Sequence, residues 1–499
     1  MANYLSFNFP YPLLSILIFL PLTGGLIALI FRHESFIKYW AFGISVVTFI
    51  LSFPLFTCFD QSTPKFQFAE YHSWVPYFKI NYVLGADGFT VLLILLTTLL
   101  TPVCILCSWR AITNRIKEFM FCLLLMEAAV IGVFSALDFF LFYIFWEAML
   151  VPMYLLIAVW GGPNKAYASL KFFIYTLAGS VFLMVAMIAL YLKTGTFSIP
   201  ELMRADLPFH FQCWVFSAFA IAFAIKVPLF PFHTWLPAAH VEAPTAGSVF
   251  LASLLLKMGT YGFIRFCLPI TPQASHYFAP LMIFLAIASI IYGGYVALGQ
   301  EDIKRLIAYS SVAHMGFVVL GIFVFNLSGI KGAVIQMVNH GITTGGLFLM
   351  IGIIYERTHS RLIVNNAGIG QLAPWYVMFL GVFSFSSFAF PGTNSFIGEF
   401  LILAGAFLEN KWVGALAVPG ALLAAAYMLR LLQRIIWRGK PKKPEIFFDL
   451  RLREICFLTP LLILIFWIGL SPGVFLRFTN NSIQHLLTDI MPRTLGIWP

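Results

Sequence analysis

The sequence predicts an all-α polytopic membrane protein. Three observations predict this class: 61% of the 499 residues are apolar, only 10% are charged, and apolar stretches recur along the whole chain. A soluble domain carries about 25% charged residues, so a soluble globular protein is excluded. Disorder is excluded as well, because polar low-complexity tracts are absent. Each apolar stretch is about 20 residues long, which is the length that crosses a bilayer as one helix.

Fourteen apolar segments predict fourteen transmembrane helices. The segments lie near residues 11–31, 38–59, 85–108, 119–137, 139–160, 168–192, 211–232, 246–267, 277–299, 306–327, 330–354, 373–408, 411–436 and 454–477. The longest polar connections lie near residues 60–84, 193–210, 355–372 and 437–453. These connections leave no room for a soluble domain. The first segment lacks a basic stretch before it and a small-residue cleavage site after it, so we expect a retained helix and not a cleaved signal peptide.

Lys and Arg residues in the connections predict the orientation. The odd-numbered connections hold 18 of the 30 Lys and Arg residues, the even-numbered connections and the termini hold nine, and Lys226, Lys257 and Arg430 lie inside segments. Connections rich in Lys and Arg stay on the cytoplasmic side. The odd-numbered connections are therefore expected to face the cytoplasm, or the matrix in a mitochondrion, and both termini the other side. The net charge of +10 indicates this topology and not nucleic-acid binding.

Two segments contain prolines that are expected to break their helices. Segment 7 has Pro228 and Pro231 after Lys226, and segment 12 has Pro391 followed by Gly392. Proline removes a backbone donor and interrupts the helical ladder. At membrane depth an interruption is tolerated only where it is buried in protein or lines a hydrated cavity. Broken helices at matching positions of two halves point to a transport site.

The two halves of the chain are related by an internal repeat. Gly179-Ser-Val-Phe-Leu-Met184 in helix 6 resembles Gly345-Gly-Leu-Phe-Leu-Met350 in helix 11, with an offset of 166 residues. The same offset aligns Lys226 with the break in helix 12, so helices 4–8 pair with helices 9–13. Because five is odd, the second repeat is expected to be inverted. The predicted divisions are residues 1–118 (helices 1–3), 119–267 (first repeat), 268–436 (second repeat) and 437–499 (a basic loop, helix 14 and the C-terminal tail).

Ionisable residues inside the apolar segments are the candidate functional residues, since a charge at this depth costs about 2.5–3.5 kcal/mol. Burial favours the neutral form of a lysine or carboxyl, and a nearby opposite charge restores the charged form. A lysine whose carboxylate partner moves away is therefore a proton switch, and Glu147 is the expected partner of Lys226. Glu399 is the expected outlet. The candidates are Glu147, Lys226, Lys257, His314, His340 and Glu399, with His233 and His240 as secondary members.

A static ion pair that fixes helix packing is the alternative interpretation of each buried charge. It carries the most weight for Glu127 in helix 4 and Arg430 in helix 13, and Asp138 is expected at an interface between helices. No redox cofactor motif is visible, because the sequence has no GxGxxG after a strand, no four-cysteine cluster spacing and no Walker A loop. Cys104 and Cys107 have CxxC spacing without a second such pair, so no metal site is expected. The chain must therefore be driven by partners or by an ion gradient.

Five motifs resemble the antiporter-like membrane subunits of respiratory complex I, the NADH-quinone oxidoreductase. They are Trp146-Glu-Ala-Met-Leu-Val-Pro-Met-Tyr154, His240-Val-Glu-Ala-Pro-Thr-Ala-Gly-Ser248, Leu255-Leu-Lys-Met-Gly-Thr-Tyr-Gly262, Ala308-Tyr-Ser-Ser-Val-Ala-His-Met315 and Pro391-Gly-Thr-Asn-Ser-Phe-Ile-Gly-Glu-Phe400. The resemblance implies fourteen helices in two inverted five-helix repeats, with helices 7 and 12 broken. It also implies that the pumping residues of the family match the six candidates. Glu399 favours the subunit M, or chain 4, branch, because some relatives have lysine at this position.

The function that this resemblance implies is proton translocation coupled to electron transfer from NADH to quinone. The chain itself is expected to hold no cofactor, with FMN, iron–sulfur clusters, NADH and quinone in other subunits. The expected partners are neighbours of the subunit L and N types, the peripheral redox arm and the lipid bilayer. The expected location is the bacterial inner membrane, or alternatively the mitochondrial inner membrane. The remaining alternatives are a membrane subunit of a multi-subunit Na+/H+ antiporter or membrane-bound hydrogenase, and a scaffold that has lost pumping.

Overall fold

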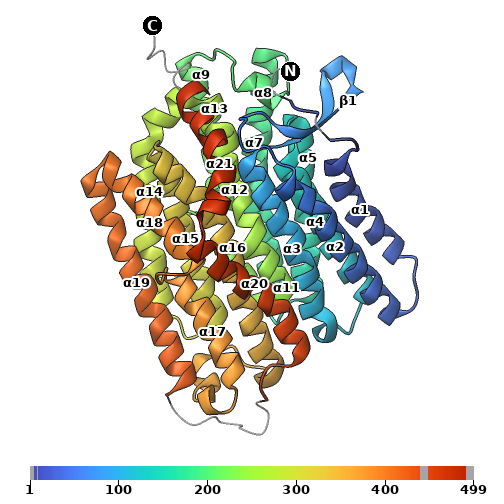
Figure 1. The fold of residues 1–499 in the computed structure, drawn as a ribbon, viewed down its shortest axis with the longest axis vertical. Coiled ribbons are helices and arrows are strands. Elements are labelled where there is room, and N and C mark those ends of the chain that lie inside the picture. The colour runs from blue at the N-terminus through green and yellow to red at the C-terminus, as the bar shows by residue number, and fades with distance from the viewer. Residues whose placement is uncertain (1–4, 8, 439–447, 491–499) are drawn as a thin grey trace.

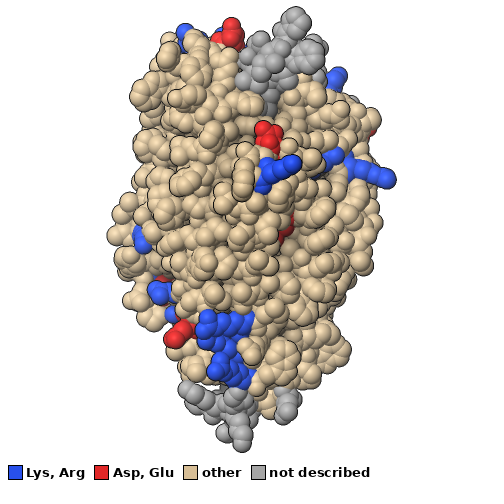
Figure 2. Space-filling model, turned by 90° about the vertical axis from the view of Figure 1, so that its left-hand side faces the viewer, with Lys and Arg blue, Asp and Glu red and all other residues tan. Residues whose placement is uncertain are grey.

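The helices of the chain run roughly side by side along the long axis of the molecule (Figure 1). The computed structural model describes residues 5–7, 9–438 and 448–490. Most of the predicted basic loop, at 439–447, and the end of the predicted tail, at 491–499, lie outside these residues. On the face that Figure 2 shows, charged side chains gather toward the two ends of the long axis and leave a broad band almost without charge. This band is the surface that a bilayer would cover.

Twelve helices of the described residues are long and apolar enough to cross a membrane. They are α2 (Glu34–Thr57), α3 (Gly88–Ala111), α4 (Ile116–Ser135), α5 with α6 (Phe139–Ala148 and Leu150–Trp160), α7 (Lys165–Thr194), α9 (Phe209–Lys226), the run Thr245–Ile270, α14 (Pro272–Leu298), α15 (Ile303–Phe323), α16 (Leu327–Thr358), α19 (Lys411–Ile436) and α20 (Leu452–Leu470). The other two predicted segments fall on α1 (Leu13–Ala28) and on the pair α17 (Pro374–Ser387) and α18 (Asn394–Glu409). Every apolar segment thus corresponds to helix, within a few residues.

The middle of the bundle is formed by α15, α16 and the run Thr245–Ile270, which are almost wholly buried, whereas no more than about a third of α2 and of α20 is buried. This run contains α11 (Thr245–Phe250), α12 (Leu256–Gly262) and α13 (Leu268–Ile270), and between them two wider π-helical turns, Leu251–Leu255 and Phe263–Cys267. In Figure 1, α11, α12 and α16 lie between α1 and α2 on one side and α19 on the other. Polar side chains on the central helices are therefore shielded from lipid.

The first predicted break lies between α9 and α10 (Trp235–Glu242). Helix α9 ends at Lys226, ahead of Pro228 and Pro231. The indole Nε1 of Trp235 donates to the carbonyl of Ile225 at 2.8 Å. This bond satisfies one of the carbonyls that the end of a helix leaves free, and such carbonyls need a partner at membrane depth.

The second predicted break separates α17 from α18 and packs against α20. A Cβ atom at Gly469 of α20 would overlap the carbonyl oxygen of Gly392. Only glycine therefore allows α20 to approach the interrupted backbone this closely. After Pro472 the chain continues as α21 (Gly473–His485) and a π-helical turn (Leu486–Ile490), part of which had been predicted as tail.

A two-stranded antiparallel sheet corrects the all-α prediction. Strands β1 (Gln67–Val75) and β2 (Ile80–Ala86) form a hairpin within the predicted polar connection 60–84, with Glu70 opposite Leu84. The strands are rich in aromatic and β-branched residues, which favour strands over helices. Buried Glu70 accepts a hydrogen bond from the amide of Leu14 at 2.8 Å, so the hairpin caps the start of α1. The short elements are α8 (Ile199–Leu202) and the 3-10 turns Pro76–Phe78, Ile363–Asn366 and Ile369–Gln371.

Candidate functional site

Lys226 lies at the end of α9 without a carboxylate in contact. Its side chain is buried, with Nζ 3.5 Å from Sδ of Met149 and 5.0 Å from the centre of the Trp146 ring. Glu147 lies between these two residues in the sequence and is half-buried, and its Oε1 has no hydrogen-bond partner. Among the described residues no ion pair joins Glu147 to Lys226 within 4.0 Å. The structure thus places Lys226 of α9 against the residues that flank Glu147 and does not pair the two predicted partners.

Lys257 lies at the start of α12, directly after the π-helical turn Leu251–Leu255, and is wholly buried. Its Nζ donates to the carbonyl of Ala252 at 2.5 Å and lies 2.6 Å from Nδ1 of His340 on α16. A π-helical turn displaces carbonyls from the regular ladder, and such turns are frequent at functional sites. The local widening of the helix therefore supplies one of the two partners of the buried lysine.

His340, His314 and Glu399 continue from Lys257 through the interior. The ring centres of His340 and His314 are 5.9 Å apart, and Nδ1 of His314 lies 2.9 Å from Oε1 of Glu399. Gln336 donates to the same carboxylate oxygen at 3.2 Å, and the hydroxyl of Tyr427 lies 3.3 Å from Nε2 of His314. Lys257, His340, His314 and Glu399 therefore form one buried series, which we call the Lys257–Glu399 series. The two histidine rings meet edge-on, and no hydrogen bond joins them directly within the described part of the chain.

The secondary histidines lie outside this series. His233 is buried in the turn between α9 and α10, with ring centres of Tyr292 and Phe230 at 5.0 Å and 5.9 Å. His240 is wholly buried in α10 and stacks on Phe348 at 4.5 Å. Neither ring nitrogen of His240 has a hydrogen-bond partner among the described residues. The structure thus brings together four of the eight predicted residues and leaves both secondary histidines apart.

The three residues with an expected structural role occupy different environments. Glu127 is wholly buried in α4, and neither carboxylate oxygen has a hydrogen-bond partner among the described residues. Arg430 is exposed near the end of α19 and donates to the carbonyl of Leu298, the last residue of α14, at 3.2 Å. Asp138 caps α5 by accepting from the amides of Phe140 and Leu141. Arg430 and Asp138 therefore stabilise helix ends, as expected of structural residues.

A polar cluster at one end of the bundle was not predicted. Arg361 lies 3.8 Å from Oε1 of Glu242 and 3.5 Å from Oδ2 of Asp302. Buried Lys304 donates to the carbonyl of Ala243 at 2.7 Å. These contacts hold the end of α10 against the start of α15. Glu242 stands two residues after His240, within one of the five motifs that resemble complex I subunits. Its place in that motif was the one feature of the sequence that could have marked it as a candidate.

A second unpredicted cluster surrounds the break between α17 and α18. The hydroxyls of Thr343 and Ser386 are 2.6 Å apart, and Ser386 donates to Oδ1 of Asn394 at 2.5 Å. Asn339 donates to the carbonyl of Asn394 at 2.7 Å and directly precedes His340 on α16. Amides and hydroxyls thus satisfy the interrupted backbone beside the Lys257–Glu399 series.

Comparison with known proteins identifies the family. Residues 136–424 match the family model described as the transmembrane part of NADH:quinone oxidoreductase and Mrp antiporters. NADH-quinone oxidoreductase subunit M of Rhodobacter capsulatus is 43% identical over 497 residues, covering 96% of each chain. The chain belongs to the subunit M, or chain 4, family of NADH-quinone oxidoreductase. The resemblance in the sequence motifs is thereby confirmed.

One further relative and one solved structure support this assignment. NADH-ubiquinone oxidoreductase chain 4 of Marchantia polymorpha is 41% identical over 481 residues, covering 96% of this chain and 97% of the relative. A chain of respiratory complex I from Thermus thermophilus, solved with bound NADH, superimposes with a TM-score of 0.87 at 31% identity and covers 95% of this chain and 99% of that one. This member of the subunit M family is an inner-membrane protein with the antiporter-like fold of complex I.

Proposed function

We propose that the chain translocates protons across the membrane within NADH-quinone oxidoreductase, coupled to electron transfer from NADH to quinone in partner subunits. One observation carries this proposal: the Lys257–Glu399 series joins the four helices α12, α16, α15 and α18 through contacts of 2.6 Å and 2.9 Å and through two histidine rings whose centres are 5.9 Å apart. A protein that merely needed rigid packing would have no reason to bury so many ionisable groups at several kcal/mol each.

The Lys257–Glu399 series provides a direction for transfer. The ammonium of Lys257 donates toward Nδ1 of His340, and the free Nε2 of His340 faces no hydrogen-bond partner of the described chain. A water between the histidines would carry the proton to His314, which contacts Glu399. The second carboxylate oxygen of Glu399 has no hydrogen-bond partner within the described ranges of the chain and would be available to pass the proton on. Glu399 is therefore the proposed outlet.

Lys226 and Glu147 form the proposed switch. The ammonium of Lys226 rests against the sulfur of Met149 and the face of Trp146, which are weak partners for a buried cation. It also lies at the carbonyl end of α9, where the helix dipole favours a positive charge. A rotation of Glu147 toward Lys226 would form an ion pair that holds the proton, and the reverse rotation would release it. His233 and His240 are the proposed secondary members on the α10 side of the break.

We further propose that the chain has fourteen membrane spans, with α1 and the α17–α18 pair completing the twelve long ones. In this proposal helices 4–8 (119–267) and helices 9–13 (268–436) are inverted repeats, preceded by helices 1–3 (1–118) and followed by helix 14 with its flanking segments (437–499). The support is that both interruptions contain the predicted prolines and glycine, the first between Lys226 and Trp235 and the second between Ser387 and Asn394.

The partners in this proposal are neighbouring subunits of the L and N types and a peripheral arm that holds FMN and iron–sulfur clusters and reacts with NADH and quinone. The proposed membrane is the bacterial inner membrane. Purification of the native complex in mild detergent, followed by mass spectrometry, tests this assignment. Redox subunits with NADH–quinone activity are expected to co-purify. Membrane subunits alone would instead support a Na+/H+ antiporter.

The variant Lys257→Met tests the translocation path. In the assembled complex, reconstituted into proteoliposomes, we expect the number of protons moved per NADH oxidised to fall, because Met cannot bond to His340. Lys331→Met is the matched control, since Lys331 lies near the start of α16 outside the series. Unchanged stoichiometry in Lys257→Met would refute the path and favour a scaffold role.

A further inference from the structure

Glu127 of α4 is a buried acid that lies outside the Lys257–Glu399 series. Its side chain is wholly buried, and neither carboxylate oxygen has a hydrogen-bond partner within residues 5–7, 9–438 and 448–490. An ionised carboxylate without a partner is costly away from water. The carboxyl of Glu127 therefore holds a proton at rest, and this proton can be passed on.

Polar side chains of α3 form a buried stripe beside Glu127. They recur at intervals of four, three and four residues, which places them on one face of the helix: Thr97, Thr101, Cys104 and Ser108. We call them the α3 stripe. The carboxyl of Glu127 faces the hydroxyl of Thr101 and acts electrostatically on the thiol of Cys104. The hydroxyl of Thr101 donates to the carbonyl of Thr97 at 3.1 Å, so its own oxygen is free to accept a hydrogen bond from the carboxyl.

The α3 stripe leads to a hollow at one end of the bundle. Ala111 follows Ser108 by three residues on the same face of α3 and lines this hollow, which has a volume of about 560 Å³. The other walls are residues 112–115, residues 158–161 and Lys165. They belong to the third and fifth connections, whose Lys and Arg residues predict that they face the cytoplasm or matrix. Water can therefore reach this end of the stripe from that side.

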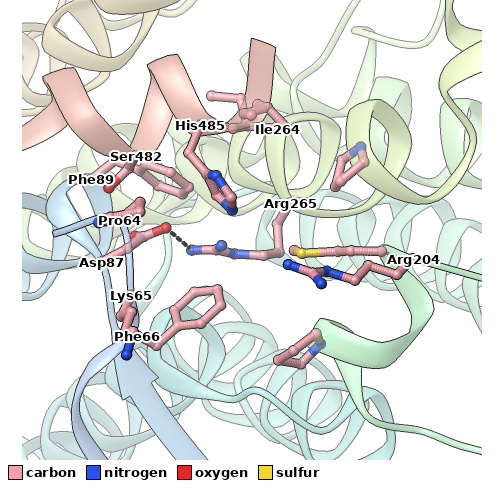
Figure 3. Close-up of a pocket in the computed structure, with 14 residues that line it drawn as sticks. Pro64, Lys65, Phe66, Asp87, Phe89, Arg204, Ile264, Arg265, Ser482 and His485 are labelled. Carbon is pink, nitrogen blue, oxygen red and sulfur yellow. Dashed lines mark hydrogen bonds and ion pairs between the residues drawn. The ribbon is translucent and has the colours of Figure 1, made fainter. Parts of the chain in front are cut away.

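The opposite end of the α3 stripe is sealed. Between the stripe and Thr90 lie the wholly buried apolar side chains of Leu93 and Ile94. Beyond them Nη2 of Arg265 contacts Oγ1 of Thr90 at 3.3 Å and pairs with Oδ2 of Asp87 at 2.6 Å (Figure 3). Apolar side chains interrupt a chain of hydrogen bonds, and a fixed guanidinium repels protons. The stripe therefore meets water at the hollow and is closed toward Arg265, as an entrance must be if protons are not to leak across the membrane.

Helix α4 places Glu127 ahead of Lys257 on the way inward from the hollow. The hydroxyl of Tyr261, one turn after Lys257, donates to the carbonyl of Phe134 at 2.8 Å. Glu127 precedes Phe134 by seven residues, about 10 Å along the helix, and Lys257 precedes Tyr261 by four, about 6 Å. Both α4 and the run Thr245–Ile270 start near the hollow and lead away from it. A proton that enters at the hollow therefore reaches the level of Glu127 first.

We propose that Glu127 is a proton-binding residue at which protons from the hollow arrive along the α3 stripe and from which they pass toward Lys257. This inference rests on the translocation proposed above. When Lys257 has given its proton to His340, the O–H bond of the Glu127 carboxyl breaks and its proton passes inward. A new O–H bond then forms with a proton from water at the hollow. The hydroxyls of Thr101 and Ser108 relay that proton, because a hydroxyl both donates and accepts hydrogen bonds.

The variant Glu127→Gln tests the entrance, and Glu409→Gln, at an exposed position, is the matched control. Gln has the shape of Glu and still donates hydrogen bonds, but it does not exchange a proton. In the assembled complex, reconstituted into proteoliposomes, we expect the rate of proton translocation to fall about threefold or more in Glu127→Gln, because an acid–base group is lost. The control should keep the wild-type rate, and Glu127→Asp, which retains a carboxyl, should recover part of it. A wild-type rate in Glu127→Gln, or equal losses in the Gln and Asp variants, would overturn the proposal.

The variant Lys257→Met, measured in parallel, separates this proposal from the proposed function. If Lys257→Met loses translocation and Glu127→Gln does not, the entrance is wrong and the path through Lys257 stands. If neither variant loses translocation, both proposals are wrong.

The variant Thr101→Val keeps the test valid if Glu127→Gln does not assemble. Val removes the hydroxyl and keeps the branched shape of Thr. Thr98→Val is the matched control, since Thr98 is equally buried in α3 but its hydroxyl lies 2.9 Å from that of Ser52 on α2. We expect translocation to slow in Thr101→Val and to match the wild type in Thr98→Val. Equal rates in the two variants would show that the hydroxyls of the stripe only bond to their own helix, and would overturn the entrance.

Discussion

The two lysine regions of this molecule differ in how their charges are connected. Lys257 contacts His340 at 2.6 Å, and the path continues through His314 to Glu399. Lys226 instead meets a sulfur atom at 3.5 Å and an aromatic face, although these groups belong to residues on either side of Glu147. The Lys257–Glu399 region is therefore a nearly complete path, and the Lys226 region is an open switch. This difference teaches that burying charges does not by itself connect them: local backbone geometry decides which ones meet.

The local backbone explains the difference. Lys226 ends a broken helix, whose carbonyls already favour a cation there. Lys257 follows a π-helical turn and projects from an unbroken run toward α16. Until Glu147 approaches, the charge of Lys226 is thus supported only by the helix end and by weak partners, whereas Lys257 is fixed by two hydrogen bonds.

The variant Lys226→Ala is the most severe test of this comparison. We expect the rate of proton translocation to fall about tenfold or more in the assembled complex, the effect of removing roughly 1.4 kcal/mol or more of transition-state stabilisation. The reason is that alanine removes the ammonium group that contacts Met149 and Trp146, together with the proton that it carries. Lys226→Arg, which keeps the charge, is expected to retain part of the activity. Intact stoichiometry in Lys226→Ala would contradict the assignment of the switch to this region.

The variant His314→Ala should have a smaller effect. We expect the rate of proton translocation to fall about two- to threefold. This change corresponds to well under the roughly 1.4 kcal/mol of a tenfold change in rate. Gln336 already donates to Glu399, and water can occupy the space of the ring next to Tyr427. The exposed His276 of α14 provides the control substitution, His276→Ala. If translocation fell as far as in Lys226→Ala, no other group could replace His314 in the path. The two lysine regions would then be equally sensitive to the loss of one side chain.

The variant Gly259→Ala probes the contact between the two regions. A Cβ atom at Gly259 of α12 would lie 2.6 Å from Cγ2 of Val227 and 3.1 Å from Cβ of Lys226. We expect the helices to move apart, with a loss of stability of about 1–3 kcal/mol and a modest fall in translocation. Thermal unfolding in nanodiscs measures the stability. Gly43→Ala is the control, since its Cβ would meet nothing within 4 Å, and an equal effect of both would contradict the proposed contact.

Asp138 lies outside both regions and should affect stability without affecting translocation. Burial raises the pKa of Asp138 to about 6, although hydrogen bonds from the amides of Asn81, Leu141 and Phe140 oppose this shift. The folded state therefore favours the protonated carboxyl more than the unfolded state does. Its stabilising contribution is complete below about pH 4 and is lost as the pH rises through about 6, by roughly 1–3 kcal/mol.

The variant Asp138→Asn should remove this pH dependence. We expect its unfolding temperature to vary less than that of the wild type between about pH 4 and 7. Translocation at neutral pH should match the wild type, because Asn can still cap α5. If the two proteins show the same pH profile of stability, the assigned pKa of Asp138 is wrong.

The sequence predicted the spans well and the irregular elements poorly. Hydropathy placed every apolar segment on helix, and Pro228 and Gly392 marked both interruptions, because these signals are local. The hairpin β1–β2 was not predicted, because the connection 60–84 was assigned from its polarity alone. The alternating aromatic residues within it were the signal for strands. The π-helical turn before Lys257 has no sequence signal, since it depends on how neighbouring helices pack.

The residue types of the candidate site were predictable, but their contacts were not. Intramembrane charge alone selected Lys257 and Glu399, whereas their connection through His340 and His314 depends on the relative rotation of four helices. The predicted pair of Lys226 with Glu147 is not formed for the same reason. Glu242 and Arg361 were overlooked because charges in connections are usually solvated, and only the fold shows that these two lie together.

His340 has a consequence for the timing of transfer. An ammonium is only a donor, so while Lys257 is charged, Nδ1 of His340 must accept and its ring proton must sit on Nε2, the nitrogen without a partner. The ring therefore cannot take up a second proton and keep the first for long in so apolar a place. Instead, the proton on Nε2 leaves the ring as the new proton reaches Nδ1. Arrival from Lys257 and departure toward His314 are then a single concerted event, and substitution of deuterium for hydrogen should slow both by the same factor.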